Sequence, residues 1–455
     1  MHTVVKQGRQ ERNGGSEMKN SKYIPVRIKF TIALVVALCW AGVSIYFARP
    51  WLGQLANHIG SPLALIVILG VAIIPGFMNG FLLASLLLDK RIKRKPLEQY
   101  PPITILIAAY NEAASIVETI ASIERQHYSG KLEVIVINDG SGDATAALAA
   151  AQVRNYPWLK LIDIRVNGGK AKALNQGLAR AAHKLIVTID ADSYLYHDAL
   201  QSIVERYLQD PPDTRAVAGS VLVRNSRASW IAKTQEWDYF HGIAAIKRVQ
   251  SLFQGVLVAQ GAFSIYDRDT LTKLGGWPEN CVGEDIVLTW AFLKAGWRVG
   301  HSEDACVFTN APATLRQFSR QRQRWSRGMI EAFKRHPGIL LKPRLSTFFV
   351  YWNLLFPLLD MVFTFAFIPG ILLALFGLFW IVGPMTLALL PIALAMNYLM
   401  YSVSSKMFKQ SGMLVRYNPL GFLIYAFGYS LIMQPICFAG YMSELLQRKK
   451  TWGTK

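Results

Sequence analysis

Charged residues are scarce in this chain of 455 residues, since Asp, Glu, Lys and Arg together make up 17% of it. Soluble globular domains carry about 25%. Apolar residues reach 52%, and their excess lies toward the two ends, whereas the middle third has the composition of a soluble domain. The shortage of charge therefore excludes a purely soluble, disordered or fibrous protein. It indicates membrane helices on both sides of one large soluble domain.

Cysteine is also rare, with four residues in the chain. Cys39 and Cys437 lie in apolar segments, and Cys281 and Cys306 lie in the middle third. Their spacing matches neither a metal-binding motif nor a disulfide framework. Other side chains must therefore supply the chemistry.

Acidic residues are outnumbered, with 29 Asp and Glu against 49 Lys and Arg and a formal net charge of +20. A strongly basic chain can bind nucleic acid or lipid. Here the basic residues lie beside apolar segments, many in residues 1–29 and another group in Lys90–Lys95. Basic flanks of membrane helices mark the cytoplasmic side. We therefore expect a membrane protein without a nucleic-acid partner, whose N-terminus and middle domain are cytoplasmic.

Two apolar segments precede the middle domain. Phe30–Ala48 can span a membrane as a helix, which needs about 20 residues. A signal peptide is the alternative, although no clear small-residue cleavage site follows this segment. Leu63–Leu88 would form a second span that returns the chain to the side of Lys90–Lys95.

Apolar character returns after residue 346. The candidate spans are Phe348–Phe367, Ile371–Val382, Met385–Val403 and Leu420–Leu445. Three spans, the first long and kinked, is the simplest count, but it would leave the basic tail outside, against the positive-inside preference. Four spans would leave the tail inside. The sequence does not decide between an odd and an even number of C-terminal spans.

Short β-rich runs alternate with helical stretches between the two apolar regions. The expected strands are Ile103–Ala108, Glu133–Ile137, Lys184–Ile189 and Val217–Val223, and the expected helices include Ala113–Glu124 and Thr145–Ala151. This alternation predicts an α/β domain whose parallel sheet is covered on both faces. Ligands of such sheets bind beyond the carboxyl ends of the strands, so the chemistry is expected there.

Carboxylates follow two of these strands. Asp139 follows Val134–Asn138, and Asp190 and Asp192 follow Leu185–Ile189. A lone Asp at such a place is often a turn or helix-capping residue. Two carboxylates one residue apart repel each other unless a cation lies between them, and hard divalent ions bind carboxylate oxygen together with substrate phosphate. The pair therefore predicts a metal–diphosphate site.

Two further motifs suit such a ligand. The glycine turn Asn167–Asn175 offers backbone N–H groups and Lys170 to phosphate or ribose oxygens, or it is simply a basic turn. Gly283 precedes Glu284 and Asp285, which either cap the next helix or supply a general base.

The segment Gln321–Trp325 reads Gln-Arg-Gln-Arg-Trp and lies on a basic amphipathic stretch that begins near Thr314. An interfacial membrane helix with Arg on its polar face explains this pattern. That role is compatible with a catalytic one. We therefore expect an interface helix between the middle domain and the C-terminal apolar region.

Together these motifs resemble those of the membrane-integrated processive glycosyltransferases of family 2, which include hyaluronan, cellulose and chitin synthases, and most of all the bacterial poly-N-acetylglucosamine synthases. Each motif is weak alone, but their order, the Gln-x-x-Arg-Trp signature and the flanking spans make the set specific. The resemblance extends from about Tyr23 to the last apolar segment. It is carried by Ala109–Glu112, Asn138–Ser141, Asn167–Leu174, Asp190–Asp192, Gly283–Asp285 and Gln321–Trp325.

The resemblance implies a GT-A-type α/β nucleotide-sugar transferase domain inserted between transmembrane helices. Asp285 would be the general base, and Asp192 and Arg324 would complete the catalytic set. Asp190 and Asp192 would bind Mg²⁺ or Mn²⁺ with the diphosphate of UDP. The residues implied to bind donor or acceptor are Ala109, Tyr110, Asn111, Glu112, Asp139, Gly140, Lys170, Asp190, Glu284, Gln321 and Trp325.

Within that set, the uridine would lie at Ala109–Glu112 and Asp139, and Trp325 would stack on the acceptor sugar. One detail departs from the family's pattern, and another adds to the resemblance. The family's usual Ser or Thr before Glu-Asp is Gly283 here, so one hydroxyl is missing before the base. Asp238 and Tyr239 resemble an acidic-aromatic pair of the poly-N-acetylglucosamine branch.

The implied domains follow the composition. They are a basic cytoplasmic N-terminus (1–29), two transmembrane helices (30–88), a cytoplasmic glycosyltransferase domain (99–312), amphipathic interface helices (313–345), three to four transmembrane helices (346–445) and a basic tail (446–455). The implied location is the bacterial inner membrane. The implied partners are a UDP-sugar, a growing polysaccharide and membrane lipids, with a small membrane subunit left open.

The implied reaction is processive, inverting synthesis of a β-linked polysaccharide from a UDP-sugar, with passage of the chain across the membrane. UDP-N-acetylglucosamine and a β-1,6 linkage are favoured by the resemblance. The alternatives are nonprocessive transfer to a lipid carrier, another polymer of the hyaluronan, chitin or cellulose kind, and a nucleotide-sensing membrane transporter or receptor. The carboxylates Asp190, Asp192 and Asp285 argue against the last of these.

Overall fold

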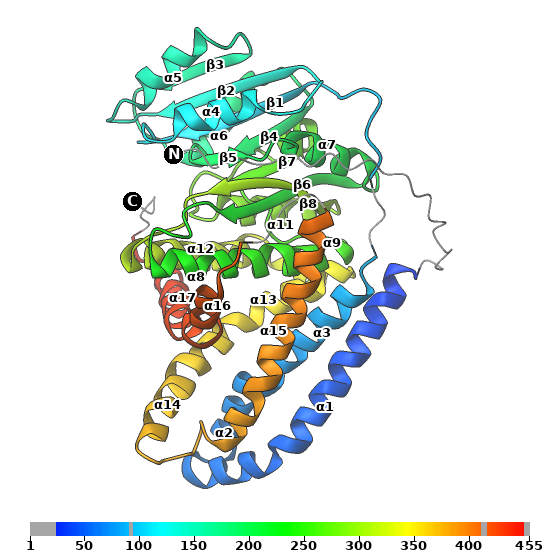
Figure 1. Ribbon diagram of the computed structural model, residues 1–455, viewed down its shortest axis with the longest axis vertical. Coiled ribbons are helices and arrows are strands. Elements are labelled where there is room, and N and C mark those ends of the chain that lie inside the picture. The colour runs from blue at the N-terminus through cyan, green and yellow to red at the C-terminus, as the bar shows by residue number, and fades with distance from the viewer. Residues whose placement is uncertain (1–23, 91–93, 411–415, 450–455) are drawn as a thin grey trace.

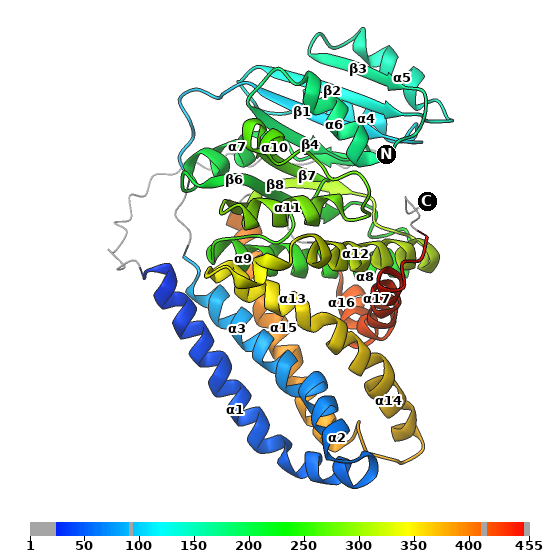
Figure 2. The ribbon, with the colours of Figure 1, turned by 180° about the vertical axis from the view of Figure 1, so that it is seen from behind.

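The computed structural model describes residues 24–90, 94–410 and 416–449. Most of the basic N-terminus, residues 91–93 and the end of the basic tail therefore lie outside the described residues. A sheet domain forms one end of the molecule and long helices form the other (Figure 1, Figure 2). Helices α8 (Trp230–His241) and α12 (Leu315–Arg335) cross the junction between the two ends.

The sheet domain is built on one eight-stranded sheet with the order β3-β2-β1-β4-β7-β6-β8-β5. Its strands are β1 (Ile103–Ala109), β2 (Leu132–Asp139), β3 (Leu159–Ile164), β4 (Leu185–Ile189), β5 (Ser193–Leu195), β6 (Thr214–Val223), β7 (Phe263–Asp267) and β8 (Arg298–Thr309). Its other helices are α4 (Ile116–Glu124), α5 (Thr145–Val153), α6 (Lys170–Arg180), α7 (Ala199–Gln209), the π-helix η2 (Gly242–Lys247), α9 (Arg248–Leu252), α10 (Arg268–Lys273) and α11 (Glu284–Lys294).

The expected strands and helices are all present, but the prediction of a wholly parallel sheet is wrong. Strand β7 is antiparallel to both β4 and β6, and β5 is antiparallel to β8. The cause lies in the segment after β6, which crosses the junction as α8, η2 and α9 and returns at the carboxyl edge of the sheet. There Phe263 pairs with Ile189, so β7 runs back toward the amino edge.

The central strands are apolar on both faces because helices cover both. Alternate residues of one strand point to opposite faces. Leu106 of β1 and Ile135 of β2 accordingly belong to one buried apolar cluster, whereas Ile105 and Val134 belong to another. The continuous apolar runs in the sequence therefore reflect burial of the sheet between two layers.

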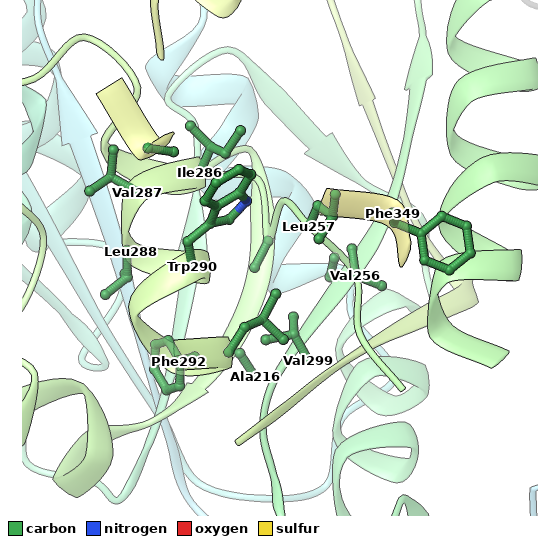
Figure 3. Packing of buried hydrophobic residues seen from close by; sticks show 14 of the residues in the cluster. Ala216, Val256, Leu257, Ile286, Val287, Leu288, Trp290, Phe292, Val299 and Phe349 are labelled. Carbon is green, nitrogen blue, oxygen red and sulfur yellow. The ribbon is translucent and has the colours of Figure 1, made fainter. Parts of the chain in front are cut away.

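The first cluster extends into the long helices. Trp290 of α11 packs among residues that include Val299 of β8, Val256 and Phe349 (Figure 3). Phe349 belongs to α13 (Leu345–Val362), which begins the C-terminal apolar region. One apolar core therefore joins the sheet domain to the helical end.

Two long apolar runs connect the N-terminal side of the chain to the sheet domain. They are α1 (Val26–Ile59) and the continuous run α2–η1–α3 (Ser61–Leu88). Near the start of α1, Phe30 contacts Phe253 with ring centroids 5.2 Å apart. Just after α3, Asp89 forms an ion pair with Arg248. The chain therefore leaves the sheet domain through α1 and returns to it through α3.

A second pair follows α12. It consists of the run α13–η4–α14 (Leu345–Leu375), which by length and composition could cross a membrane, and the long helix α15 (Pro384–Gln410). At the far end, the indole N–H of Trp51 in α1 donates to the carbonyl of Trp380 over 3.1 Å. At the near end, Phe408 of α15 contacts Phe240 of α8 with centroids 5.4 Å apart. This pair also leaves the sheet domain and returns.

The last apolar run, α16–η5–α17 (Pro419–Leu445), behaves differently, although its length and composition also suit a membrane span. Before its start, Asn418 donates to the carbonyl of Lys233 in α8 over 2.9 Å. Near its end, Glu444 pairs with Arg327 of α12 at 3.1 Å. Both of its ends therefore lie at the junction, and α17 runs beside α12 (Figure 2).

Helix α12 begins where the sequence predicts. The Thr314 hydroxyl accepts from the Gln317 N–H, and the Gln317 side chain accepts from the Thr314 N–H. This capping box satisfies backbone donors at the helix start. The expected amphipathic helix from Thr314 is confirmed.

Candidate active site

The carboxyl ends of three neighbouring strands bring together the first predicted residues. Strands β2, β1 and β4 are adjacent and parallel. β1 ends at Ala109, β2 ends at Asp139, and β4 stops just before Asp190. These residues therefore lie along one edge of the sheet, as the sequence predicted.

The loop after β1 is held in place mainly by hydrogen bonds to the loop after β2. Asn111 has a φ of 55°, its N–H donates to the Ser141 hydroxyl over 3.0 Å, and its side-chain oxygen accepts from the Gly142 N–H over 2.9 Å. Glu112 accepts a hydrogen bond within its own turn. Tyr110 is left 51% exposed. The loop therefore presents an aromatic ring at the sheet edge, which suits a nucleoside.

Asp139 is buried beneath the glycine turn. Its two carboxylate oxygens accept from the N–H groups of Gly168 and Gly169 over 2.9 and 2.8 Å. Gly140 has a φ of 68°, and a Cβ there would lie 2.6 Å from the Asn167 nitrogen. Both residues therefore fix residues 167–169, and their contact with uridine stays a prediction.

Lys170 begins α6 and faces three carboxylates. Its ammonium forms an ion pair with Asp190 and lies 3.9 Å from Glu284. Burial alone would lower the pKa of Lys170, but Asp190, Glu284 and Asp285 raise the pKa above its usual value. Lys170 therefore stays charged and joins the strand edge to the start of α11.

The position of Lys170 depends on a glycine that the sequence reasoning missed. A Cβ on Gly261 would lie 2.6 Å from the Lys170 nitrogen. A side chain at position 261 would therefore force the end of the Lys170 side chain to move from its present place. A single glycine between Gln260 and Ala262 gives no signal in the sequence that could have shown this.

The predicted metal ligands lie on one turn. Asp190 is half-buried, and Asp192 accepts from the Thr309 hydroxyl over 3.3 Å. The chemistry of these oxygen donors fits Mg²⁺ or Mn²⁺. The Nε atom of Arg324 and the Oε1 atom of Gln321 are buried and have no hydrogen-bond partner among the described residues. Phosphate oxygens and a sugar hydroxyl would satisfy them, so the residues fit a cation bound with a diphosphate.

The Gly-Glu-Asp motif begins α11 and is fixed to α12. The N–H groups of Val282 and Gly283 donate to the Glu331 carboxylate over 2.8 and 3.0 Å. The backbones of Gly283 and Gly328 also lie in contact. They are so close that a Cβ on Gly283 would lie 2.5 Å from the Gly328 Cα. A serine or threonine at position 283 would therefore push α11 and α12 apart.

Asp285 is half-buried in the first turn of α11, where its Oδ1 atom accepts from the Ile286 N–H over 2.8 Å. Burial raises the pKa of the neighbouring Glu284, while Lys170 opposes the rise. Burial also lowers the pKa of Lys247 to about 7, and the charge of Asp285 opposes that change. The charge of Asp285 therefore acts on two lysines, Lys170 and Lys247, and the sequence did not reveal the second of them.

Helix α12 carries the remaining predicted residues. Arg324 lies near enough to Glu284 to lower its pKa. Burial raises the pKa of Tyr239 in α8, and Gln321 opposes that rise. Trp325 keeps 43% of its surface exposed, and its ring centroid is 6.1 Å from that of Tyr239. The structure therefore brings α12, the candidate base and the strand-edge carboxylates into one region.

Restoring the family's usual side chain tests the contact between α11 and α12. Gly283→Ser should lower both the thermal unfolding midpoint and the transfer rate, because overpacking of this kind costs about 1–3 kcal/mol. The control is Gly338→Ser, since a Cβ on Gly338 meets nothing within 4 Å. Thermal melts in detergent and release of the nucleotide product measure the two effects. A Gly283→Ser protein with wild-type stability and rate would contradict the contact.

Among solved structures, the fold is similar to that of the mannosyltransferase PcManGT from Pyrobaculum calidifontis in complex with GDP-Man and Mn²⁺. The TM-score is 0.54 with 21% sequence identity, and the alignment covers 90% of this chain and 100% of that chain. At this identity the likeness shows the fold alone. The sheet domain therefore has the GT-A-like fold of nucleotide-sugar transferases, with apolar helices on both sides of it in the chain.

The family model "Glycosyltransferase like family 2" matches residues 101–328. The chain belongs to this family. It is therefore a glycosyltransferase, and the transporter or receptor alternative is set aside.

Curated relatives give a finer comparison. The poly-beta-1,6-N-acetyl-D-glucosamine synthase of Staphylococcus aureus (strain COL) is 33% identical over 247 residues, which cover 54% of this chain and 59% of that protein. The synthase of the same name from Staphylococcus epidermidis is 31% identical over 271 residues, which cover 57% and 65%. The match thus spans less than two thirds of the length of these relatives.

Proposed function

We propose that this protein is a processive, inverting glycosyltransferase that polymerises N-acetylglucosamine from UDP-N-acetylglucosamine into a β-1,6-linked polysaccharide and passes it across the membrane. The observation that carries the proposal is the backbone contact of Gly283 with Gly328. It holds the candidate base Asp285 at a fixed distance from the helix that carries Arg324 and Trp325. The names of the curated relatives favour the sugar and the linkage.

In the proposed reaction, Asp285 removes the proton of the acceptor hydroxyl as its oxygen attacks C1 of the donor sugar. The bond from C1 to the UDP oxygen breaks, and UDP leaves with the electron pair. Arg324 and Lys170 stabilise the charge that develops on the diphosphate. A divalent cation held by Asp190 and Asp192 would neutralise further charge there. A single displacement inverts C1, so an α-linked donor gives a β-linked product.

The arrangement of the helices supports a membrane topology. We propose that α1, α2–α3, α13–α14 and α15 cross the membrane and that α16–α17 lies at its surface beside α12. Arg327 of α12 donates to the carbonyl of Arg448 over 2.7 Å, which keeps the start of the basic tail at the junction. This topology reduces the expected C-terminal spans from three or four to two. It places both basic termini and the catalytic domain in the cytoplasm, in agreement with the positive-inside preference.

The experiment that tests the function is UDP release by purified protein against a panel of UDP-sugars, followed by linkage analysis of the product. We expect UDP-N-acetylglucosamine to be turned over fastest and the product to be β-1,6-linked. Turnover confined to another UDP-sugar would overturn the sugar assignment. UDP release with a product of one or two sugars would favour nonprocessive transfer.

Substitutions of Trp325 distinguish two possible roles of this residue, a stacking surface for the acceptor sugar and a membrane anchor. The Trp325→Leu protein should make no polymer while it still binds UDP, because stacking on a sugar needs a broad aromatic face. Trp325→Phe should retain part of the activity. Product length on a sizing gel and UDP binding measure these effects.

A matched control is Trp230→Leu, since Trp230 at the start of α8 is 50% exposed. An anchor should tolerate Leu at either position because Leu keeps apolar area. Polymer of wild-type length from Trp325→Leu would therefore assign Trp325 to membrane anchoring.

A further inference from the structure

Arg322 occupies a variable position of the Gln-x-x-Arg-Trp motif, yet it is buried. Its guanidinium donates to the Asp238 carboxylate of α8 over 2.7 Å. Burial alone would lower the pKa of Arg322, but Asp238 raises it well above its usual value. An arginine buried in this way requires a charged partner, so Asp238 is the reason that Arg322 can stay beneath the surface of α12.

The guanidinium also lies against the ring of Trp325. The distance from its carbon to the indole centroid is 4.2 Å, which is within the range of a cation–π contact. Residues three apart on a helix lie on one face, so the Arg322 side chain packs against the Trp325 indole on the same face of α12. Trp325 is still 43% exposed. The indole therefore has one region held by the cation and another open to a ligand.

Three elements meet at this cation. Besides Trp325, the guanidinium lies 5.0 Å from the ring of Phe318 in α12 and 5.9 Å from the rings of Tyr239 in α8 and Tyr429 in the η5 turn. The orientation of the Trp325 indole is therefore set by groups from α8 and from the apolar run beside α12, as well as by its own helix.

From this geometry we propose that Asp238 and Arg322 are positioning residues, which hold the Trp325 indole in the orientation that stacks on the acceptor sugar and thereby set acceptor affinity and chain length. The inference rests on the proposed function and deepens it. Neither residue is placed at the diphosphate or at the base. Loss of the pair should therefore affect the acceptor and spare the donor.

The test compares Asp238→Asn, Arg322→Gln and Arg322→Lys in the full-length protein in detergent. Three quantities are measured: hydrolysis of UDP-N-acetylglucosamine without acceptor, the KM and kcat for transfer to a β-1,6-linked N-acetylglucosamine oligomer, and product length. We expect Asp238→Asn and Arg322→Gln to raise the acceptor KM about tenfold or more and to shorten the product, with hydrolysis and the donor KM within about twofold of wild type.

Two comparisons separate positioning from a merely structural role. Arg322→Lys should recover part of the acceptor affinity, because an ammonium keeps both the ion pair and the cation–π contact. The double variant Asp238→Asn/Arg322→Gln should resemble the single variants, since the two residues act as one unit. Asp89→Asn is the control, because it removes another buried carboxylate paired with an arginine, Arg248, outside the site.

Acceptor KM and product length that stay at wild-type values in both single variants would overturn the inference while the proposed function stands. Equal losses of hydrolysis and transfer, shared by Asp89→Asn, would also overturn it, because the pair would then act on stability alone. Absence of polymer from the wild-type protein would instead contradict the proposed function, and the inference with it.

Discussion

Asp285→Asn should bind the UDP-sugar with wild-type affinity and lose transfer by about 10²–10⁴-fold, the usual contribution of a positioned general base. The amide has the shape of the carboxylate, and its oxygen can still accept from the Ile286 N–H as Oδ1 does now at 2.8 Å. It cannot take the acceptor proton. The contact of Gly283 with Gly328, which fixes the start of α11, is untouched by the change.

The measurement is UDP binding by calorimetry alongside polymer synthesis from the same preparation. Asp269→Asn is the control, because Asp269 also lies in the first turn of a helix, α10, and is exposed away from the site. It should bind donor and synthesise polymer as the wild type does. Near-normal polymer synthesis by Asp285→Asn would show that the base lies elsewhere.

Removal of divalent cations should reduce UDP release to background, and Mg²⁺ or Mn²⁺ should restore it. The physical reason is the charge at this edge, where a diphosphate would lie beside Asp190, Asp192 and Glu284. Lys170 pairs with Asp190 and lies 3.9 Å from Glu284. Like charges this close need a cation before they can lie together. Chelator titration with a UDP-release assay measures the effect.

Asp192→Asn refines this prediction. With one oxygen ligand weakened, the variant should need more metal for half-maximal UDP release and have a lower maximal rate, whereas Asp269→Asn should titrate with metal as the wild type does. Full activity in excess chelator would remove the metal from the account. An unchanged metal requirement in Asp192→Asn would remove that residue from the metal site.

The parts of the site that could be predicted are those that strand ends and helix caps define. Asp139 and Asp190 follow apolar runs, and Thr314 with Gln317 forms a capping box, so short stretches of sequence were sufficient. The antiparallel β7 could not be predicted in this way. Its direction depends on the path of the chain after β6, and a strand has the same apolar pattern in either direction.

Contacts between distant segments also escaped prediction. Glu331 reads as an ordinary helix residue, and only the fold shows that it binds the N–H groups of Val282 and Gly283. Hydropathy likewise cannot distinguish a helix that crosses a membrane from one that lies beside α12, because both are long and apolar. The bonds that Asn418 and Glu444 make at the two ends of Pro419–Leu445 are what support our proposal that this run lies at the membrane surface.

Processive synthesis is the central claim, and a pulse–chase of chain length tests it most directly. Purified protein is given labelled UDP-N-acetylglucosamine for a time in which few chains have started, and unlabelled donor is then added in excess. A processive enzyme should give labelled chains that are long from the earliest times and lengthen further in the chase, because the acceptor stays on Trp325 between additions. Labelled products of one to a few sugars, released and diluted by the chase, would contradict it.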